Sequence, residues 1–286
     1  GKWMEEGELQ RLSADLRTIA SRTLPAGALE YGVFSGDRTR LEHSIITLVY
    51  QRADKKPIAF NALAIMDLKL AQRPQEVMHL GLVMVDPDVR SRGLSWILYG
   101  LTCFLLFLRN QLRPLWVSNV TQVPAVVGMV TDSFSSIYPS PKPEARRSLS
   151  HLILARQIMK HHRPVFGVGP EAGFDEERFV ITNAYTGGSD GLKKTFEAAT
   201  KHRDETYNLF CARQLDYERG DDVLQIGQMT MKTARAYLTD SVPRDSLAAL
   251  LVAGFAALLD VDLRVSTPRE LLITALLLML AFGVGA

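Results

Sequence analysis

The segment with the clearest chemical capacity is residues 90–95 (RSRGLS), which holds two arginines and a glycine between two predicted elements. A strand predicted to end at Val85 precedes it, and a helix predicted over residues 95–112 follows. The first N–H groups of a helix lack partners within the helix, glycine lets a ligand approach closely, and Arg90 and Arg92 add positive charge. This combination indicates a phosphate site. Neither GxxxxGKS/T nor GxGxxG occurs, which excludes the two common nucleotide loops at this place.

At these residues the chain resembles the GNAT superfamily of CoA-dependent N-acyltransferases, whose signature is Q/R-x-x-G-x-G/A after a strand. Arg90 and Gly93 match the fixed positions, and Ser95 stands where the family has Gly or Ala. The order of predicted elements over about residues 8–140 is also similar to the family. The resemblance implies an α/β fold, a mixed sheet flanked by helices, with acyl-CoA as co-substrate and no metal.

The resemblance also implies where the cofactor binds. In the family, the strand before the loop splays from the next strand, and the pantetheine arm of the thioester lies in the gap. Backbone groups around Val83 and Val85 would pair with that arm, and Asn119 would lie across the gap, although Asn119 equally fits a turn-capping residue. Loop amides would hold the pyrophosphate: those of Ser91, Arg92, Gly93, Leu94 and Ser95.

Two further roles follow from the resemblance. Histone-type members place a glutamate base eleven residues before the signature, and here that position is His79. A neutral imidazole suits a base near pH 7, but a lone histidine on an apolar strand is also typical of a hydrogen-bonded core residue. Glu76 is the second candidate. Many members protonate the leaving thiolate with a tyrosine in a helix that here, at residues 124–134, has none. Tyr138 is therefore the candidate acid, and the alternative is a packing ring beside Pro139.

Periodicity predicts the elements that position these residues. A Pro-rich break at residues 137–143 predicts the end of a core domain at residues 1–143. A mixed helical extension at 144–240 and a hydrophobic helical hairpin at 241–286 would follow. Within the core we expect helices over residues 8–23, 95–112 and 124–134, and strands over 29–34, 44–51, 57–68, 76–85 and 115–119.

Two segments of the extension each have a structural and a binding interpretation. Residues 145–163 form a basic helix candidate, which is either a solvated face or a contact for acidic head groups or cofactor phosphates. Residues 187–190 (GGSD) precede a helix predicted over 190–202. They are either a capped loop or a phosphate cradle, and the capped loop is the more typical outcome.

The most apolar segments are unusual for a soluble GNAT. Residues 96–108 are apolar around the whole predicted helix, so an apolar surface must cover the outer face. Residues 247–259 and 271–286 carry no charge and predict a helical hairpin, although each run is shorter than the ~18–20 residues of a standard span. The hairpin would dip into a membrane, form a homodimer interface or cover the core. We expect it to attach the protein to a membrane and to shape an acyl-chain tunnel beside the 95–112 helix.

Composition limits the remaining possibilities. Apolar residues make up 47% of the 286-residue chain and charged residues 22%, which excludes wholesale disorder. A net charge of +2 gives no argument for nucleic acid. The two cysteines, Cys103 and Cys211, are too few for a disulfide framework, and the start of the chain has no apolar signal segment, so we expect a cytoplasmic, membrane-associated protein.

The function expected from these features is transfer of an acyl group from acyl-CoA, or from an acyl carrier protein, to an amine. The apolar segments suggest a lipid-like substrate or a long acyl chain. One alternative is acetyl transfer to a small amine or peptide. Another is a non-catalytic module that binds acyl-CoA at a membrane, which would have no need of a base such as His79.

Overall fold

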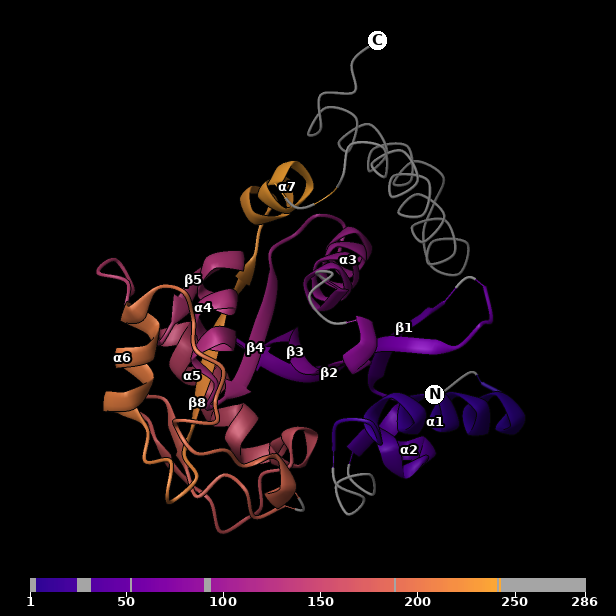
Figure 1. The fold of residues 1–286 in the computed structure, drawn as a ribbon. Helices are drawn as coiled ribbons and strands as arrows, with labels where there is room; N and C mark the ends of the chain where they lie inside the picture. Colours follow the sequence, from indigo (N-terminus) through magenta and orange to yellow (C-terminus); the bar gives the residue numbers. More distant parts are fainter. Residues whose placement is uncertain are drawn as a thin grey trace.

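The protein is described by a computed structural model that covers residues 4–24, 32–51, 53–89, 94–187, 189–240 and 242. Its centre is an eight-stranded mixed sheet in the order β1-β2-β3-β4-β8-β7-β6, with β5 also paired to β8 (Figure 1). Every neighbouring pair is antiparallel except β3 and β4, which are parallel. The strands are β1 (Ser44–Tyr50), β2 (Pro57–Leu70), β3 (Arg73–Val85), β4 (Leu115–Thr121), β5 (Ser135–Tyr138), β6 (Gly173–Asp175), β7 (Val180–Thr182) and β8 (Asp222–Met229).

Helices cover both faces of the sheet, because consecutive strand residues point to opposite sides. Met78 and Val117 pack with α3, α4 and α7, whereas Val77 and Trp116 pack with α5. Helix α1 lies on the α5 side against Phe60 and its neighbours; Figure 1 shows α3 above the sheet and α1 below it. The α-helices are α1 (Glu6–Ala20), α2 (Arg38–Leu41), α3 (Leu94–Arg109), α4 (Pro124–Ser133), α5 (Leu149–His161), α6 (Glu205–Gln214) and α7 (Met231–Asp240).

The predicted elements of the first half are largely confirmed, with ends displaced by a few residues. The hairpin expected from residues 44–51 and 57–68 is β1–β2. A second hairpin joins β2 to β3 through Ala71 and Gln72, both at positive φ, as a two-residue turn requires. The strand expected at residues 29–34 is wrong in its described part, since Gly32–Ser35 is a 3-10 helix. The helix expected over 190–202 is also wrong, because only Asp190–Leu192 forms a short 3-10 turn.

The sheet does not stop at the domain boundary predicted at residue 143. Strand β8 pairs with the full length of β4, and α5 covers the sheet through Leu154 and Ile158. The residues expected to form a separate helical extension therefore contribute a central strand. The reason is that β4 has a partner on only one edge within the first 143 residues, and a bare edge in the middle of a sheet needs a second strand.

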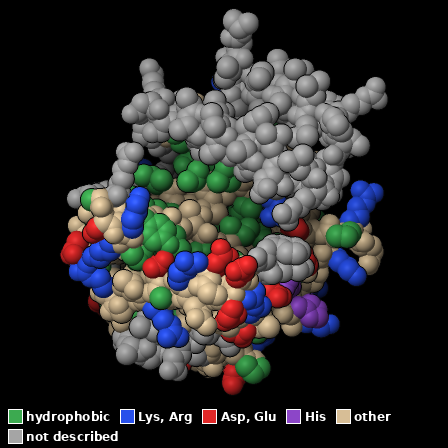
Figure 2. Space-filling model, turned by 90° about the vertical axis from the view of Figure 1, so that its right-hand side faces the viewer, with side chains coloured by type: hydrophobic (Ala, Val, Ile, Leu, Met, Phe, Trp, Pro, Cys, Tyr) green, Lys and Arg blue, Asp and Glu red, His purple; other side chains and the backbone are tan. Residues whose placement is uncertain are grey.

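Helix α3 combines a buried and an accessible side. Phe104 and Phe107 are fully buried, whereas Ile97 is 42% exposed. Figure 2, which looks at the side of the molecule that carries β1, shows hydrophobic side chains gathered in the middle of that face. The hairpin predicted over residues 247–286 lies outside the described residues. Within the part of the chain that is described, no helix has the length and apolarity needed to cross a bilayer.

Candidate functional site

The parallel strands β3 and β4 separate part-way along their length. They pair only at Val77↔Trp116, Met78↔Val117 and His79↔Ser118. Both strands continue beyond these pairs, β3 to Val85 against β2 and β4 to Thr121 against β8. Over the described residues, the facing edges of β3 and β4 therefore have no strand partner past His79 and Ser118, and an unpaired strand edge has backbone groups that can pair with another chain.

A β-bulge at the start of this gap explains the separation. Ala62 pairs with Leu82 and Ala64 with His79, so two residues of β3 lie opposite one residue of β2. A bulge bends its strand and increases the local twist, which turns β3 away from β4. Gly81 sits in this bulge, where a Cβ would lie 2.3 Å from the carbonyl oxygen of Ala62. The Tyr99 hydroxyl donates to the Gly81 carbonyl at 2.6 Å and ties the bulge to α3.

His79 lies at the point where the strands separate. It is 3% exposed, its Nδ1 lies 3.1 Å from Ser118 Oγ, and its ring lies 5.1 Å from the ring of Phe166. Burial lowers the pKa of His79 to about 4, so the imidazole is neutral at pH 7. A neutral imidazole held by a hydroxyl can take up one proton. Ser118 and Phe166 were not expected from the sequence, because only the register of β4 and the path of the chain after α5 bring them to His79.

The structure describes some of the cofactor-binding residues expected from the resemblance, and others lie outside the described part of the chain. Val83 and Val85 lie on the part of β3 that faces the gap and pair on their other edge with Asn61 and Ala59. Helix α3 begins at Leu94, with Ser95 as its second residue, as expected. The signature loop itself lies outside the described residues: Arg90, Ser91, Arg92 and Gly93.

Both ends of the undescribed loop are anchored by buried polar side chains. Before the loop, the Asp86 carboxylate is 1% exposed and binds Arg22 Nη1 at 2.7 Å and Lys56 Nζ at 3.3 Å. After the loop, the buried amide of Asn61 donates to the Leu98 carbonyl of α3 at 2.9 Å. These contacts fix the end of β3 and the start of α3. Asp86 stands directly after an apolar strand in the sequence, but no local pattern indicates its partners.

Asn119 does not present its side chain to the gap. It is 2% exposed and its amide donates to Gln225 Oε1 at 3.3 Å. Gln225 donates in turn to Thr131 of α4 and to the Pro139 carbonyl. Asn119 is therefore committed to the α4 side of the sheet and holds the base of α4 against β8, which is a structural role.

The other two candidate catalytic residues are not brought to His79. Tyr138 pairs with Ile226, which pairs with Ser118, so three strand spacings of about 4.8 Å separate Tyr138 from His79 in one row across the sheet. Its hydroxyl donates to the Glu177 carbonyl at 3.1 Å, and its ring packs on Phe179. This environment is that of a packing ring, the alternative to a catalytic acid.

Glu76 is exposed and lies opposite Asp67, one residue before the pairing of β3 with β4 begins. It therefore lies outside the gap, which starts after His79. Of the three catalytic candidates, His79 alone stands at the point where the strands separate.

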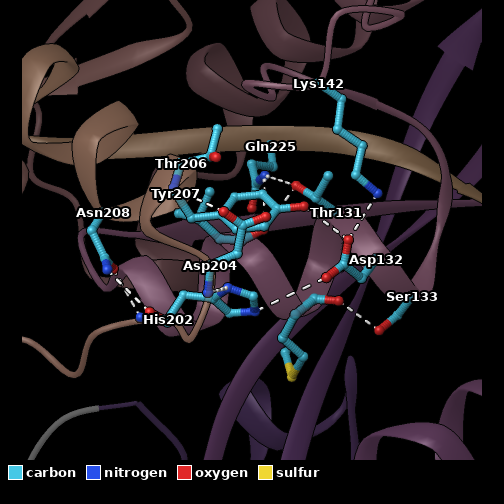
Figure 3. A network of polar contacts seen from close by, with 12 residues as sticks. Thr131, Asp132, Ser133, Lys142, His202, Asp204, Thr206, Tyr207, Asn208 and Gln225 are labelled. Carbon is cyan, nitrogen blue, oxygen red and sulfur yellow. Dashed lines mark hydrogen bonds and ion pairs between the residues drawn. The ribbon is translucent and has the colours of Figure 1, made fainter.

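A cavity of about 180 Å³ lies on the opposite face of the sheet from His79, between α3, α4 and α7. Leu80 of β3, Met229 of β8 and Cys103 of α3 contribute to its lining, which is mostly apolar. Asp132, near the end of α4, also lines it. Its carboxylate accepts the Tyr207 hydroxyl at 2.8 Å and pairs with Lys142 Nζ at 2.8 Å (Figure 3). No local sequence pattern indicates this cavity, since its walls are far apart in the chain.

The two segments with a possible role in anion binding make internal contacts. In the basic segment, Arg156 forms an ion pair with Glu176 at 2.6 Å, and Arg163 donates to the Ala172 carbonyl at 2.6 Å. In the GGSD segment, the Ser189 hydroxyl donates to the Gly167 carbonyl, and a Cβ at Gly187 would lie 2.5 Å from that oxygen. Gly188 lies outside the described residues. Arg156, Arg163 and the described residues of the GGSD segment thus make contacts within the protein.

Among the residues that the structure describes, no three His, Cys, Asp or Glu side chains gather in a way that could hold a metal ion.

Comparisons with known proteins add little. No family model and no curated protein matches the chain. Among solved structures, a mutant of the BH1408 protein from Bacillus halodurans is 13% identical with a TM-score of 0.21, over 34% of this chain and 62% of that one. A tetramutant of the same protein is 14% identical with a TM-score of 0.23, over 37% of this chain and 70% of that one. The first match thus spans less than two thirds of its partner, and scores this low carry no argument about fold or function.

Proposed function

We propose that the protein is a GNAT-type acyltransferase that moves an acyl group from acyl-CoA, or from an acyl carrier protein, to an amine. The observation that carries the proposal is the separation of β3 from β4 directly after His79, upstream of the RSRGLS segment. An open strand edge fits the amide-bearing arm of a pantetheine thioester, because backbone groups can pair with amides as a further strand would. A loop with Arg90 and Arg92 at a helix start fits the pyrophosphate.

In this proposal the thioester arm lies along the β3 edge near Val83 and Val85, and its carbonyl reaches the level of His79. The acceptor amine attacks that carbonyl, the new C–N bond forms, and the C–S bond breaks as the thiolate leaves. His79 takes the proton that the amine loses and passes it to the thiolate, so charge and atoms balance. Ser118 holds the imidazole in place at 3.1 Å. A positioned base of this kind contributes roughly 10²–10⁴-fold to the rate.

The acceptor is proposed to be lipid-like, and attachment to a membrane surface is proposed through residues 247–286. A dimer through the same residues is the alternative arrangement. These parts of the proposal rest on the apolar character of that sequence.

The test of the cofactor site is the affinity for CoA of Gly93→Glu, measured by calorimetry. A glutamate there adds a side chain and a negative charge where phosphate must bind, and we expect binding to be lost. Gly7→Glu is the matched control, because a side chain at this exposed position of α1 meets nothing within 4 Å. Equal affinity of wild type and Gly93→Glu would remove the basis of the proposal.

One observation favours a second function, a module that binds acyl-CoA without turning it over. A pKa of about 4 makes His79 a weak base, and Tyr138 is remote from the gap. The two functions differ in one measurement. A transferase releases free CoA from acyl-CoA only when an amine acceptor is supplied, whereas a binding module retains the donor intact.

A further inference from the structure

The cavity between α3, α4 and α7 begins where the proposed reaction would occur. Leu80, which lines it, directly follows His79 and projects to the opposite face of β3. Tyr99, which also lines it, donates its hydroxyl to Gly81 in the bulge. Leu80 and Tyr99 thus place the cavity beside the stretch of β3 that has separated from β4, on the opposite face of the sheet from His79. A group held along this edge of β3 would have the cavity next to it.

The cavity extends from this point away from the signature loop. Met229 lines it and pairs with Leu115, the first residue of β4, whereas the gap opens toward Thr121 at the other end of that strand. Helix α3 also runs in this direction, from its start after the loop past Cys103. A donor that enters with its pyrophosphate at the loop and its thioester near His79 would thus direct its acyl chain toward α7.

The lining suits an alkyl chain. Leu80, Met129 and Met229 contribute apolar side chains, and Tyr237 packs over Gly100, where a Cβ would lie 2.0 Å from the ring. The Cys103 thiol adds no charge, because burial raises its pKa to about 12. The carboxylate of Asp132 is already held by Lys142 and Tyr207.

We propose that this cavity holds the acyl chain of the donor and that the preferred donor carries a chain of about six carbons. This inference rests on the proposed function and adds the class of donor to it. The size follows from the volume, since an apolar cavity of ~150 Å³ accepts benzene, and this one measures about 180 Å³. Each buried methylene strengthens binding about fourfold, at ~0.8 kcal/mol. Affinity should therefore rise from acetyl-CoA to hexanoyl-CoA and then level off.

The experiment compares free CoA, acetyl-CoA, hexanoyl-CoA and dodecanoyl-CoA by calorimetry on the full-length protein. We expect hexanoyl-CoA to bind wild type at least tenfold more tightly than acetyl-CoA, and dodecanoyl-CoA to add less than threefold more. Cys103→Leu fills the cavity from α3 and should abolish the tighter binding of hexanoyl-CoA relative to acetyl-CoA. Ala236→Phe fills it from an exposed position of α7, which keeps the test valid if Cys103→Leu does not fold. Ala212→Phe, the same substitution on the exposed side of α6, should behave as wild type.

The outcomes separate the two proposals. If free CoA binds but chain length has no effect in wild type, the cavity does not hold the chain, and the acyltransferase proposal stands. If hexanoyl-CoA still binds more tightly than acetyl-CoA in both Cys103→Leu and Ala236→Phe, the cavity proposal is also overturned, since the acyl chain must then lie elsewhere. If no CoA compound binds, the proposed function fails and this inference fails with it.

Discussion

At the scale of single residues, His79 combines the position of a catalytic base with the environment of a core residue. The ring is buried, contacts Ser118 and packs against Phe166, and its pKa is lowered to about 4 because burial disfavours the charged form. Two buried carboxyl groups elsewhere differ in their partners. Asp86 is held by Arg22 and Lys56, whereas the one described side chain that binds Asp222 is Tyr185, whose hydroxyl donates to it at 3.0 Å.

Replacement of His79 by glutamine tests the catalytic role. We expect kcat to fall by about 10²–10⁴-fold, the usual contribution of a general base, with CoA affinity largely preserved. The neutral imidazole is the active form. The pH–rate profile should therefore have an acidic limb near pH 4, where His79 becomes protonated, with activity kept above that pH and lost below it. That limb should be absent in His79→Gln when kcat/KM is followed against pH. A fall of less than threefold would assign His79 to the core.

Replacement of Asp222 by asparagine tests the cost of the second buried carboxyl. Burial raises the pKa of Asp222 to about 7, so the folded state keeps a proton that the unfolded state loses near pH 4. Stability from this group is therefore present below pH 4 and is lost as the pH rises to 7, by up to about 4 kcal/mol. Asp222→Asn should be more stable than wild type at pH 8 and gain little at pH 4, as measured by urea unfolding.

Asp221→Asn provides the opposite control for this prediction. The Asp221 carboxylate pairs with Arg219 at 2.6 Å and its pKa is lowered, so the charged form belongs to the folded state. We expect this variant to lose stability at pH 8. If Asp222→Asn also loses stability at pH 8, the Asp222 carboxyl is ionised in the folded protein and stabilises it.

At the scale of elements, the bulge in β3 is the feature that creates the site. It bends β3 away from β4, and two contacts support it, the close approach of Gly81 to Ala62 and the hydrogen bond from Tyr99. The bulge thereby links the strand that carries His79 to the helix that follows the signature loop.

Gly81→Ala tests this link. A Cβ at 2.3 Å from the Ala62 carbonyl forces the backbone to move, and we expect a loss of about 1–3 kcal/mol in the free energy of unfolding, together with weaker CoA binding. Thermal and urea unfolding measure the first effect and calorimetry the second. Gly7→Ala is the control, since a Cβ there meets nothing within 4 Å and Gly7 lies in the first turn of α1, where alanine fits the helical backbone. Unchanged stability of Gly81→Ala would mean that the bulge relaxes freely.

At the scale of the whole molecule, one sheet joins the two halves of the chain. Strand β8 fills the open edge of β4 and carries β5 and β7 on its own far edge. Helix α5 covers the same face that α1 covers further along the sheet. The first 143 residues thus lack a central strand and part of their hydrophobic cover.

A chain truncated after residue 143 should therefore fail to fold by itself. It would expose the edge of β4 and the apolar side chains of Val77 and Trp116 that α5 covers. We expect no cooperative thermal transition by circular dichroism and a tendency to aggregate. A chain ending at residue 242 retains β8 and α5 and serves as the comparison. A cooperative transition in the shorter chain would restore residues 1–143 as an independent domain.

The sequence by itself determined the local elements and the position of the candidate site along the chain. Apolar periodicity predicted β1, β2, β3, α3 and α4, because each buries a face that repeats at its own period. Tertiary structure alone decided what lies next to His79. Ser118 arrives through the register of β4, Phe166 through a turn after α5, and the cavity through the meeting of α3, α4 and α7. Such neighbours come from pairing across many residues, and a local pattern carries no information about the partner.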